Sequence, residues 1–340
     1  MSNLANNTVT MEEILALVQS LPEGGGGGFP NGTEWTQSNI TSGKGRGFLY
    51  ANGLWVAGGD ILRYSTDGKT WTDATPTSRE DEFENFNAVD YANGLWLASS
   101  GYLGLWSSTD GKTWSCILDS DEGFGGVAFV GGFWFVYEGG ILRFSEDGAT
   151  WSAGYDFGDN IVKAMYEYGV YLVATGSGIY YSEDATVWTK VLSKYCYTIC
   201  NGSGVFVAAT GSGLYHSTDA ITWTQSNVTS GTFYAAEHAN GFFVAASSTS
   251  GLYYSEDGRT WVHSNATNIS TRGLCYANGV WVAGGSNIGL WFSSDGKFWT
   301  QSNVTSGDCR RIYNANGVWV AGGTTSSANG IYYSVGWEPS

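Results

Sequence analysis

A seven-residue pattern, Ser-x-Asp-Gly-x-x-Trp, recurs along this chain and constrains the fold more than any other feature. It occurs seven times, twice with Ala in place of Gly, beginning at Ser65, Ser108, Ser145, Ser182, Ser217, Ser255 and Ser293. About fifteen residues before each copy lies a second motif, typified by Asn-Gly-Leu-Trp-Val-Ala-Gly-Gly, which occurs eight times. Successive tryptophans of the first motif are 35 (Trp188 to Trp223) to 43 (Trp71 to Trp114) residues apart. A repeat of this length is a supersecondary unit that buries its faces against its neighbours.

Each repeat predicts four short strands rather than helices. In the first repeat we expect them near residues 46–51, 54–58, 61–65 and 70–73. The Asn-Gly pair between the first two strands suits a tight hairpin turn, because both residues accept positive φ at low cost. The composition agrees, with 50 Gly, 16 Trp and 21 Tyr against only 4 Pro. Four antiparallel strands per unit predict an all-β, eight-bladed β-propeller.

The seven-residue motif has a structural interpretation. The Asp carboxylate can accept backbone N–H groups across its own turn, while the Trp packs between adjacent sheets. Two copies carry Ala instead of Gly after the Asp, at Ala185 and Ala220. We therefore expect a structural role for the seven aspartates, which are Asp67, Asp110, Asp147, Asp184, Asp219, Asp257 and Asp295.

Eight copies of the second motif stand against seven of the first, so one blade lacks its last strand. Residues 30–43 (PNGTEWTQSNITSG) are similar to residues 294–307 (SDGKFWTQSNVTSG), although they lie near the other end of the chain. The match predicts that residues 33–38 form the outer strand of blade eight, with Trp35 in the place of the motif tryptophan. Closure of this kind removes an open sheet edge. We expect the propeller to span residues 29–340.

Residues 1–28 lie outside the repeat. Thr10 can cap a short helix over residues 11–21 that carries an apolar stripe, and glycines follow at residues 24–28. A helix this short needs a partner to be stable. Two interpretations remain open: it docks on its own propeller, or it mediates self-association or attachment to a fibre or other assembly. The glycine linker favours the second.

The charge balance excludes some partners. The chain has 15 Lys and Arg against 31 Asp and Glu, a net charge of −16, so we expect no nucleic-acid partner. No apolar run approaches the length of a membrane span, and we expect no signal peptide. The five cysteines lack CxxC spacing, so we expect thiols packed in the core, no metal site and no cofactor.

The seven-residue pattern resembles the Asp-box (BNR-like) repeat, Ser-x-Asp-x-Gly-x-x-Trp, with one departure: here Gly follows Asp directly. The resemblance extends over nearly all of residues 30–340 and implies a β-propeller. It leaves the activity open, because Asp-box propellers include sialidases, other glycosidases, lectin-like binders and assembly factors. The acidic, Asn/Thr/Gly-rich composition is also similar in style to bacteriophage or prophage tail-fibre proteins. That similarity implies a virion- or tail-associated protein, cytoplasmic before assembly.

Catalysis is the weaker interpretation of this sequence. A sialidase-like site needs an arginine triad, a Tyr/Glu pair and an acidic proton donor, and a glycosidase needs two close carboxylates. Acidic residues gather in loops at residues 80–84, 119–122 and 156–159, but such runs are usually solvated surface. A glycoside hydrolase acting on an acidic polysaccharide and a structural spacer remain alternatives. We favour a non-catalytic recognition propeller that binds a surface glycan or protein receptor through its loops, which include three near copies of TQSNVTSG.

An alignment of the inner strands on their turn glycines predicts where a ligand binds. One column contains Arg46, Asn87, Gly125, Val162, Tyr197, Tyr234, Arg272 and Arg310. Two residues later follows an apolar column that we expect to be buried between blades, namely Phe48, Val89, Val127, Ala164, Ile199, Ala236, Leu274 and Ile312. The first column then lies at the mouth of the central channel.

Three arginines of the first column belong to consecutive blades once the ring closes. Guanidinium groups placed side by side predict an anion pocket that grips a carboxylate or phosphate, with tyrosine rings as a wall. The predicted ligand-binding residues are Arg46, Arg272, Arg310, Arg311, Lys44, Tyr234 and Tyr197. The alternative is that Asp308 and Asp60 simply neutralise these charges at the surface.

Overall fold

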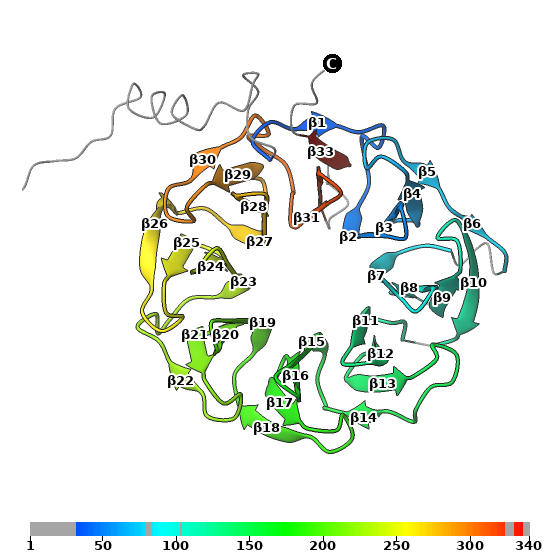
Figure 1. Ribbon diagram of the computed structural model, residues 1–340, viewed down its shortest axis with the longest axis horizontal. Helices are drawn as coiled ribbons and strands as arrows, with labels where there is room; N and C mark the ends of the chain where they lie inside the picture. The colour runs from blue at the N-terminus through cyan, green and yellow to red at the C-terminus, as the bar shows by residue number, and fades with distance from the viewer. Residues whose placement is uncertain (1–31, 79–82, 103, 121, 324–329, 336–340) are drawn as a thin grey trace, which may run out of the picture.

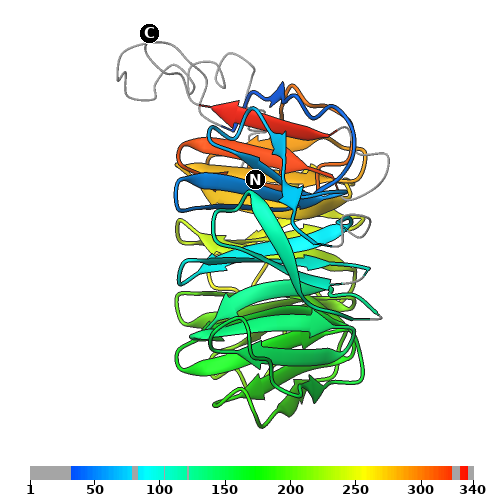
Figure 2. The ribbon, with the colours of Figure 1, turned by 90° about the vertical axis from the view of Figure 1, so that its right-hand side faces the viewer.

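The computed structural model describes residues 32–78, 83–102, 104–120, 122–323 and 330–335. Eight sheets surround a common axis, so the chain forms an eight-bladed β-propeller (Figure 1). Seen from the side, the strands run between the two faces of the ring (Figure 2). The predicted all-β fold and the number of blades are confirmed. The predicted helix over residues 11–21 lies outside the described residues.

Each blade has four strands, ordered outward from the axis. Blade one has β2 (Gly45–Ala51), β3 (Leu54–Gly59), β4 (Arg63–Ser65) and β5 (Thr72–Asp73). Blade two has β7 (Phe86–Ala92), β8 (Leu95–Ser100), β9 (Gly104–Ser108) and β10 (Thr113–Leu118), with the short β6 (Thr75–Pro76) parallel to β10. Blade three has β11 (Gly126–Val130), β12 (Phe133–Glu138), β13 (Ile141–Ser145) and β14 (Tyr155–Asp156). Blade four has β15 (Ile161–Glu167), β16 (Val170–Thr175), β17 (Gly178–Ser182) and β18 (Thr189–Leu192).

The remaining blades follow the same order. Blade five has β19 (Cys196–Gly202), β20 (Val205–Thr210), β21 (Gly213–Ser217) and β22 (Thr224–Gln225). Blade six has β23 (Phe233–Ala239), β24 (Phe242–Ser247), β25 (Gly251–Ser255) and β26 (Val262–Thr267). Blade seven has β27 (Thr271–Ala277), β28 (Val280–Gly285), β29 (Leu290–Ser293) and β30 (Thr300–Gln301). Blade eight has β31 (Arg311–Ala315), β32 (Val318–Gly322), β33 (Ile331–Val335) and, from the other end of the chain, β1 (Thr36–Gln37).

The ring closes as the sequence predicts. β1 pairs antiparallel with β33, with Thr36 opposite Tyr333, and beyond the strand Ser38 N donates to the Ile331 carbonyl. The paired segment is shorter than the predicted 33–38. Trp35 is buried, and its Nε1 donates to the carbonyl of Gly32, three residues earlier, as most of the motif tryptophans do in their own turns.

The seven-residue motif forms a tight turn, the box turn, between the third and fourth strands. In blade three, Ser145 Oγ donates to Asp147 Oδ1 (2.9 Å) and accepts from Gly148 N (2.8 Å). The same carboxylate oxygen accepts the N–H groups of Thr150 (2.7 Å) and Ala149 (2.8 Å). These bonds, first from Thr150 and Ala149, lower the pKa of Asp147 to about 2. All other box turns repeat the two backbone contacts, which explains why the motif recurs.

Aromatic side chains fill the space between neighbouring sheets. At the closure, Trp55 of blade one is fully buried, with its ring 6.5 Å from that of Trp71 and 5.9 Å from that of Tyr313 in blade eight. The apolar column predicted from the alignment of the inner strands is buried in five blades and partly exposed in three. Its buried members are Phe48, Val127, Ala164, Ile199 and Ala236, and its partly exposed members are Val89, Leu274 and Ile312.

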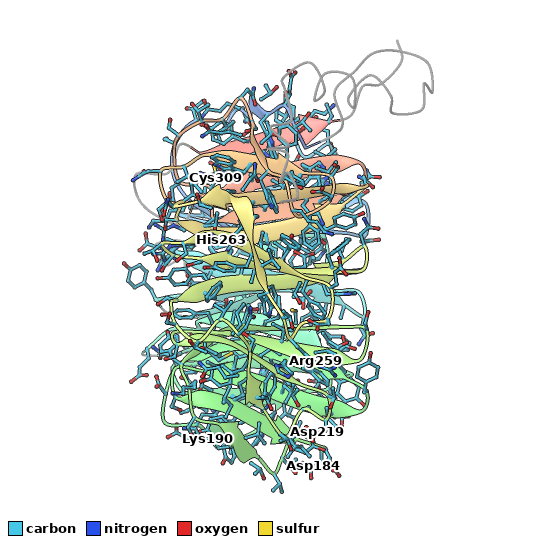
Figure 3. The ribbon with its side chains drawn as sticks, turned by 90° about the vertical axis from the view of Figure 1, so that its left-hand side faces the viewer. Asp184, Lys190, Asp219, Arg259, His263 and Cys309 are labelled. Atoms are coloured by element: carbon cyan, nitrogen blue, oxygen red, sulfur yellow. The ribbon has the colours of Figure 1, made fainter. Side chains whose placement is uncertain are left out.

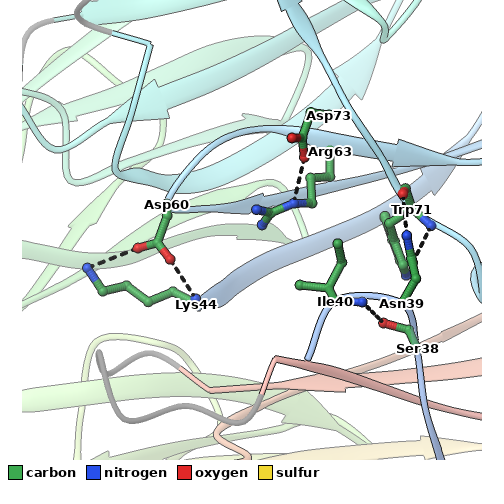
Figure 4. Close-up of polar contacts among 8 residues, drawn as sticks. All are labelled: Ser38, Asn39, Ile40, Lys44, Asp60, Arg63, Trp71 and Asp73. Carbon is green, nitrogen blue, oxygen red and sulfur yellow. Dashed lines mark hydrogen bonds and ion pairs between the residues drawn. The ribbon is translucent and has the colours of Figure 1, made fainter. Parts of the chain in front are cut away.

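Asparagine side chains join the outer strands of neighbouring blades. Asn39 Oδ1 accepts the N–H of Trp71 (2.8 Å), and Asn39 Nδ2 donates to the Trp71 carbonyl (2.8 Å; Figure 4). We call this pair of hydrogen bonds an asparagine clamp. The same clamp joins Asn227 to Trp261, Asn265 to Trp299 and Asn303 to Trp35.

The clamps explain the near copies of TQSNVTSG, which the sequence places among the ligand-binding loops. The asparagine of each copy is committed to the backbone of the next blade, and the glutamines Gln225 and Gln301 donate to carbonyls within their own turns. Between blades one and two, backbone hydrogen bonds join the outer strands in place of a clamp: the N–H groups of Thr75 and Thr77 donate to the carbonyls of Lys112 and Trp114. This repetition therefore reflects contacts between blades.

The box turns predict how stability changes in acid. Six box aspartates have pKa values lowered below the ordinary 3.8, those of Asp110 and Asp147 to about 2. Because the unfolded chain binds these protons more readily, the free energy of unfolding should fall as the pH drops from about 4 toward 2. Urea unfolding followed by tryptophan fluorescence at several pH values measures this loss. Asp147→Asn keeps an acceptor without a charge and should show a smaller loss; equal pH dependence in both proteins would contradict the assignment.

The clamps predict a cost for loss of the closing contact. Asn303→Ala leaves the N–H and the carbonyl of Trp35 without this partner, so the free energy of unfolding should fall by about 1–3 kcal/mol. Urea unfolding measures the change. Asn160→Ala, an exposed asparagine outside the clamps, is the matched control and should differ little from the native protein. A similar loss in both variants would show that the clamp contributes nothing specific.

Candidate functional site

The innermost strands begin with an irregularity that recurs around the ring. In six blades the pairing of the first two strands skips one residue, as between Gly45 and Gly47 of β2. A bulge of this kind takes a residue out of the ladder and re-aims its side chain. The skipped residues are Arg46, Asn87, Val162, Tyr197, Tyr234 and Arg272. In the other two blades, Gly125 and Arg310 directly precede β11 and β31.

These bulge positions lie at the face of the ring opposite to the box turns. The first residue of β2 pairs with the last residue of β3, so the bulge is at the end where strands two and three are joined. The box turns join strands three and four at the other end. Figure 3 shows Asp184, Asp219 and Arg259 of three box turns along one face and Lys190, His263 and Cys309 along the other. We call the second face, which carries the bulges, the loop face.

Four arginines of the loop face form what we call the arginine arc: Arg46, Arg272, Arg310 and Arg311. Arg46 Nη1 donates to the side-chain oxygens of Asn85 (2.5 Å) and Asn87 (2.7 Å). Arg311 Nε donates to the backbone carbonyl of Arg46 (2.9 Å), which joins blade eight to blade one. Both guanidinium groups are thus oriented by neutral acceptors.

Arg272 is held in a different way. Its guanidinium carbon lies 4.0 Å from the centroid of the Tyr234 ring, a cation–π contact between blades seven and six. Its Nε is buried and has no hydrogen-bond partner among the described residues. The ring attracts the guanidinium through its negative face but supplies no counter-ion.

Two carboxylates do accompany the arc, as the alternative interpretation of the sequence expects. Arg310 Nε donates to Asp308 Oδ1 (2.6 Å), whose side chain is 3% exposed. Lys44 Nζ lies 3.3 Å from Asp60 Oδ1, and the Lys44 N–H donates to Asp60 Oδ2 (Figure 4). These pairs leave three arginines unmatched: within the described parts of the chain, no carboxylate lies at ion-pair distance from Arg46, Arg272 or Arg311.

Arg311 shows the electrostatic consequence. Part of its side chain is exposed, but protein atoms surround the rest. This desolvation lowers the pKa of Arg311, and the charges of Arg310 and Arg46 lower it further. Asp308 acts in the opposite direction without cancelling the effect. The arc therefore holds like charges close together in a protein whose net charge is −16.

Next to the arc lies an aromatic cluster, the tyrosine stack, formed by Tyr195, Tyr197 and Tyr234. The rings of Tyr195 and Tyr197 are 4.4 Å apart with an interplanar angle of 35°, and those of Tyr197 and Tyr234 are 4.7 Å apart at 71°. Since Tyr234 carries Arg272 on its face, the stack continues directly into the arc. The structure thus brings the predicted tyrosines and arginines together on five consecutive blades of the closed ring, from blade five through blade eight to blade one.

Two members of this region, Asn85 and Tyr195, were not predicted from the sequence. Both lie in loops before the inner strands, where no periodic pattern marks them. Asp90 and Glu237, which lie further along inner strands, were not predicted either. Their carboxylates accept the N–H groups of Phe129 (2.6 Å) and Tyr276 (3.3 Å) in the next blade, and burial raises the pKa of each. An acidic residue at an otherwise apolar strand position was the available signal.

The other candidate chemistries find little support in the described residues. They include no group of three or more His, Cys, Asp or Glu that could hold a metal ion. Burial raises the pKa of Cys196 and Cys309 to about 12, so these thiols are unreactive. Residues 80–82 and 121 of the acidic loops lie outside the described residues. No helix of the described chain is long and apolar enough to cross a membrane.

Comparisons with known proteins place the fold. No protein-family model matches the sequence, and the search of curated proteins gives no match. Among solved structures, Sqt1 of Saccharomyces cerevisiae superposes with a TM-score of 0.68 at 9% identity, over 92% of this chain and 100% of that one. YCF48 bound to D1 peptide gives a TM-score of 0.54 at 15% identity, over 90% and 97%.

A further neighbour is an ancestral GH74 enzyme, with a TM-score of 0.53 at 13% identity over 86% of this chain and 60% of that one. At such identities the similarity shows the fold alone, which is shared by peptide-bound and enzymatic proteins. The resemblance to Asp-box and tail-fibre proteins stays a resemblance in sequence.

The unmatched charges predict an unusual response to mutation. Arg311→Gln removes one of several crowded charges and keeps a donor for the Arg46 carbonyl, so it should raise the free energy of unfolding by up to about 1 kcal/mol at low salt. The gain should fade at about 1 M salt, where the Debye length is about 3 Å. Urea unfolding at both salt concentrations measures it. Arg63→Gln, which breaks an ion pair with Asp73, is the control and should bring no gain; a loss of stability in both variants would contradict charge repulsion in the arc.

Proposed function

We propose that this protein is a non-catalytic recognition propeller that binds an anionic group of a surface glycan or protein receptor at the arginine arc. One observation carries the proposal: Arg46, Arg272 and Arg311 are oriented by neutral groups and lack a carboxylate partner in the described structure. Crowded unmatched charges destabilise the free protein. An anionic ligand would relieve that repulsion.

The geometry suits a ligand of this kind. Guanidinium groups bind carboxylate, sulfate or phosphate through paired hydrogen bonds, and these are stronger than bonds between neutral groups. Because hydrogen bonds and stacking already orient the arginines, binding costs little further side-chain entropy. The arc lies on the loop face, where the segments between blades vary while the box turns repeat.

The contacts of the nearby carboxylates disfavour catalysis. A general acid of a glycosidase needs an environment that keeps its carboxyl group protonated. Asp308 and Asp60 instead lie in ion pairs with Arg310 and Lys44. A glycoside hydrolase therefore remains the second candidate, supported by the acidic loops and by a neighbour in fold, and a structural spacer the third.

The setting we propose is a display assembly such as a phage or prophage tail fibre. The support comes from sequence: the acidic Asn/Thr/Gly-rich composition, and a predicted helix and glycine linker in residues 1–28 that can attach the propeller to an assembly. Comparison of the full chain with a chain lacking residues 1–28 by light scattering tests this setting. The same number of subunits in both would count against self-association through that segment.

Binding at the arc is tested with a double variant, Arg46→Gln with Arg311→Gln. Removal of two guanidinium charges should weaken binding of inorganic sulfate, measured by calorimetry, at least tenfold. Arg310 is left intact because its loss would deprive the buried Asp308 of its ion pair and destabilise the fold. Arg63→Gln, on the outer part of blade one, is the matched control and should bind as the native protein does.

A panel of surface polysaccharides, with a parallel assay for released reducing ends, tests recognition against catalysis. We expect acidic polysaccharides to bind without release of reducing ends. Sulfate binding that is unchanged in the double variant would overturn the arc as the site. Release of reducing ends by the native protein would overturn the non-catalytic assignment.

A further inference from the structure

The tyrosine stack ends in an exposed ring on the loop face. Tyr195 is 45% exposed and directly precedes the inner strand β19 of blade five. Its backbone is fixed, because Gly211 N donates to the Tyr195 carbonyl (3.0 Å). One side of its ring packs on Tyr197 at a centroid distance of 4.4 Å. Tyr195 thus presents an aromatic surface to solvent from a rigid support.

The stack connects this surface to the arginine arc without a break. Tyr197 contacts Tyr234, and Tyr234 carries the guanidinium of Arg272, so each ring touches the next member. The electrostatics of Tyr197 agree with this arrangement. Burial raises the pKa of Tyr197, the neighbouring Tyr234 and Tyr195 raise it further, and Arg272 lowers it. An exposed aromatic platform therefore lies at one end of the stack, and at the other end lies a cation that has no carboxylate partner among the described residues.

We infer that the anionic ligand of the arc is an acidic saccharide, in which one sugar ring stacks on Tyr195 while a carboxylate is bound by the arginine arc. This inference rests on the proposed function. A pyranose ring has an apolar C–H face that packs on an aromatic ring and a polar edge that stays in water. In a uronic acid the carboxylate is attached directly to such a ring. A short acidic saccharide can therefore place one ring on Tyr195 and the carboxylate of another unit at the arc.

Other anionic ligands fit the stack less well. An acidic peptide offers carboxylates on flexible chains but no flat apolar face to cover Tyr195. A nucleic acid offers flat bases, but its continuous phosphate charge is repelled by a protein of net charge −16. The pairing of one platform with one cluster of cations matches a saccharide best.

Tyr102 provides a matched control. It is 57% exposed and follows β8 in the loop between strands two and three, so it shares the loop face with Tyr195. Among the described residues it makes no ring contact and no cation–π contact, so it is not part of the stack. Its loss should remove a similar exposed ring without effect on the ligand.

The experiment compares three probes by calorimetry: a hexasaccharide of alternating glucuronate and N-acetylglucosamine, hexaglutamate, and inorganic sulfate. Tyr195→Ala should weaken binding of the hexasaccharide about three- to tenfold and leave binding of sulfate unchanged. Tyr195→Phe, which keeps the ring, and Tyr102→Ala should bind the hexasaccharide as the native protein does. Thermal unfolding of each variant confirms that the fold is retained.

The outcomes separate this inference from the proposed function. If Tyr195→Ala binds the hexasaccharide as tightly as the native protein, or if hexaglutamate binds as tightly as the hexasaccharide, the saccharide assignment is wrong while the anion site stands. If the native protein binds none of the three probes, the anion site itself is absent and the saccharide assignment falls with it.

Discussion

Packing of each sheet against both of its neighbours is the interaction on which the rest of this structure depends. A four-stranded blade on its own leaves two apolar faces in water, so eight blades are stable only when the ring closes. The closure joins the ends of the chain: β1 completes blade eight, Trp35 fills the tryptophan site and Asn303 clamps it. Contacts between Trp55 and Tyr313 then complete the core between blades eight and one.

Convergence of the blades at the axis explains where large side chains can lie. The inner strands approach so closely that a Cβ on Gly273 would lie 2.4 Å from the carbonyl oxygen of Arg310 in the next blade. Five of the eight residues one position after the bulge column are accordingly Gly or Ala, and the two long ones, Lys163 and Arg311, reach over the next strand to its carbonyls. The bulge position escapes this restriction because its side chain leaves the ladder at the loop face.

The contrast between the box turns and the arginine arc shows two uses of charge. In a box turn, backbone N–H groups surround the carboxylate, as for Asp147, so the charge stabilises the turn that carries it. In the arc, amide oxygens, a peptide carbonyl and an aromatic face orient the guanidinium groups but do not neutralise them. Like charges held in this second way reduce the stability of the folded protein.

The sequence by itself determined the repeat, the blade number and the closing strand. Hydrophobic periodicity, turn residues and box spacing are local features, and the sequence of each blade contains its own set of them. Alignment of the strands also brought together in one column the six residues that the structure shows in bulges. The positions of Asn85 and Tyr195 could not be predicted in this way, because loop residues follow no periodic pattern. Only the tertiary structure decided which polar residues make contacts that hold the fold together. The asparagines of TQSNVTSG bind the next blade, Asp308 pairs with Arg310, and Arg46 meets neutral amides, because partners up to a full ring apart in sequence are chosen by the packing of blades rather than by local spacing.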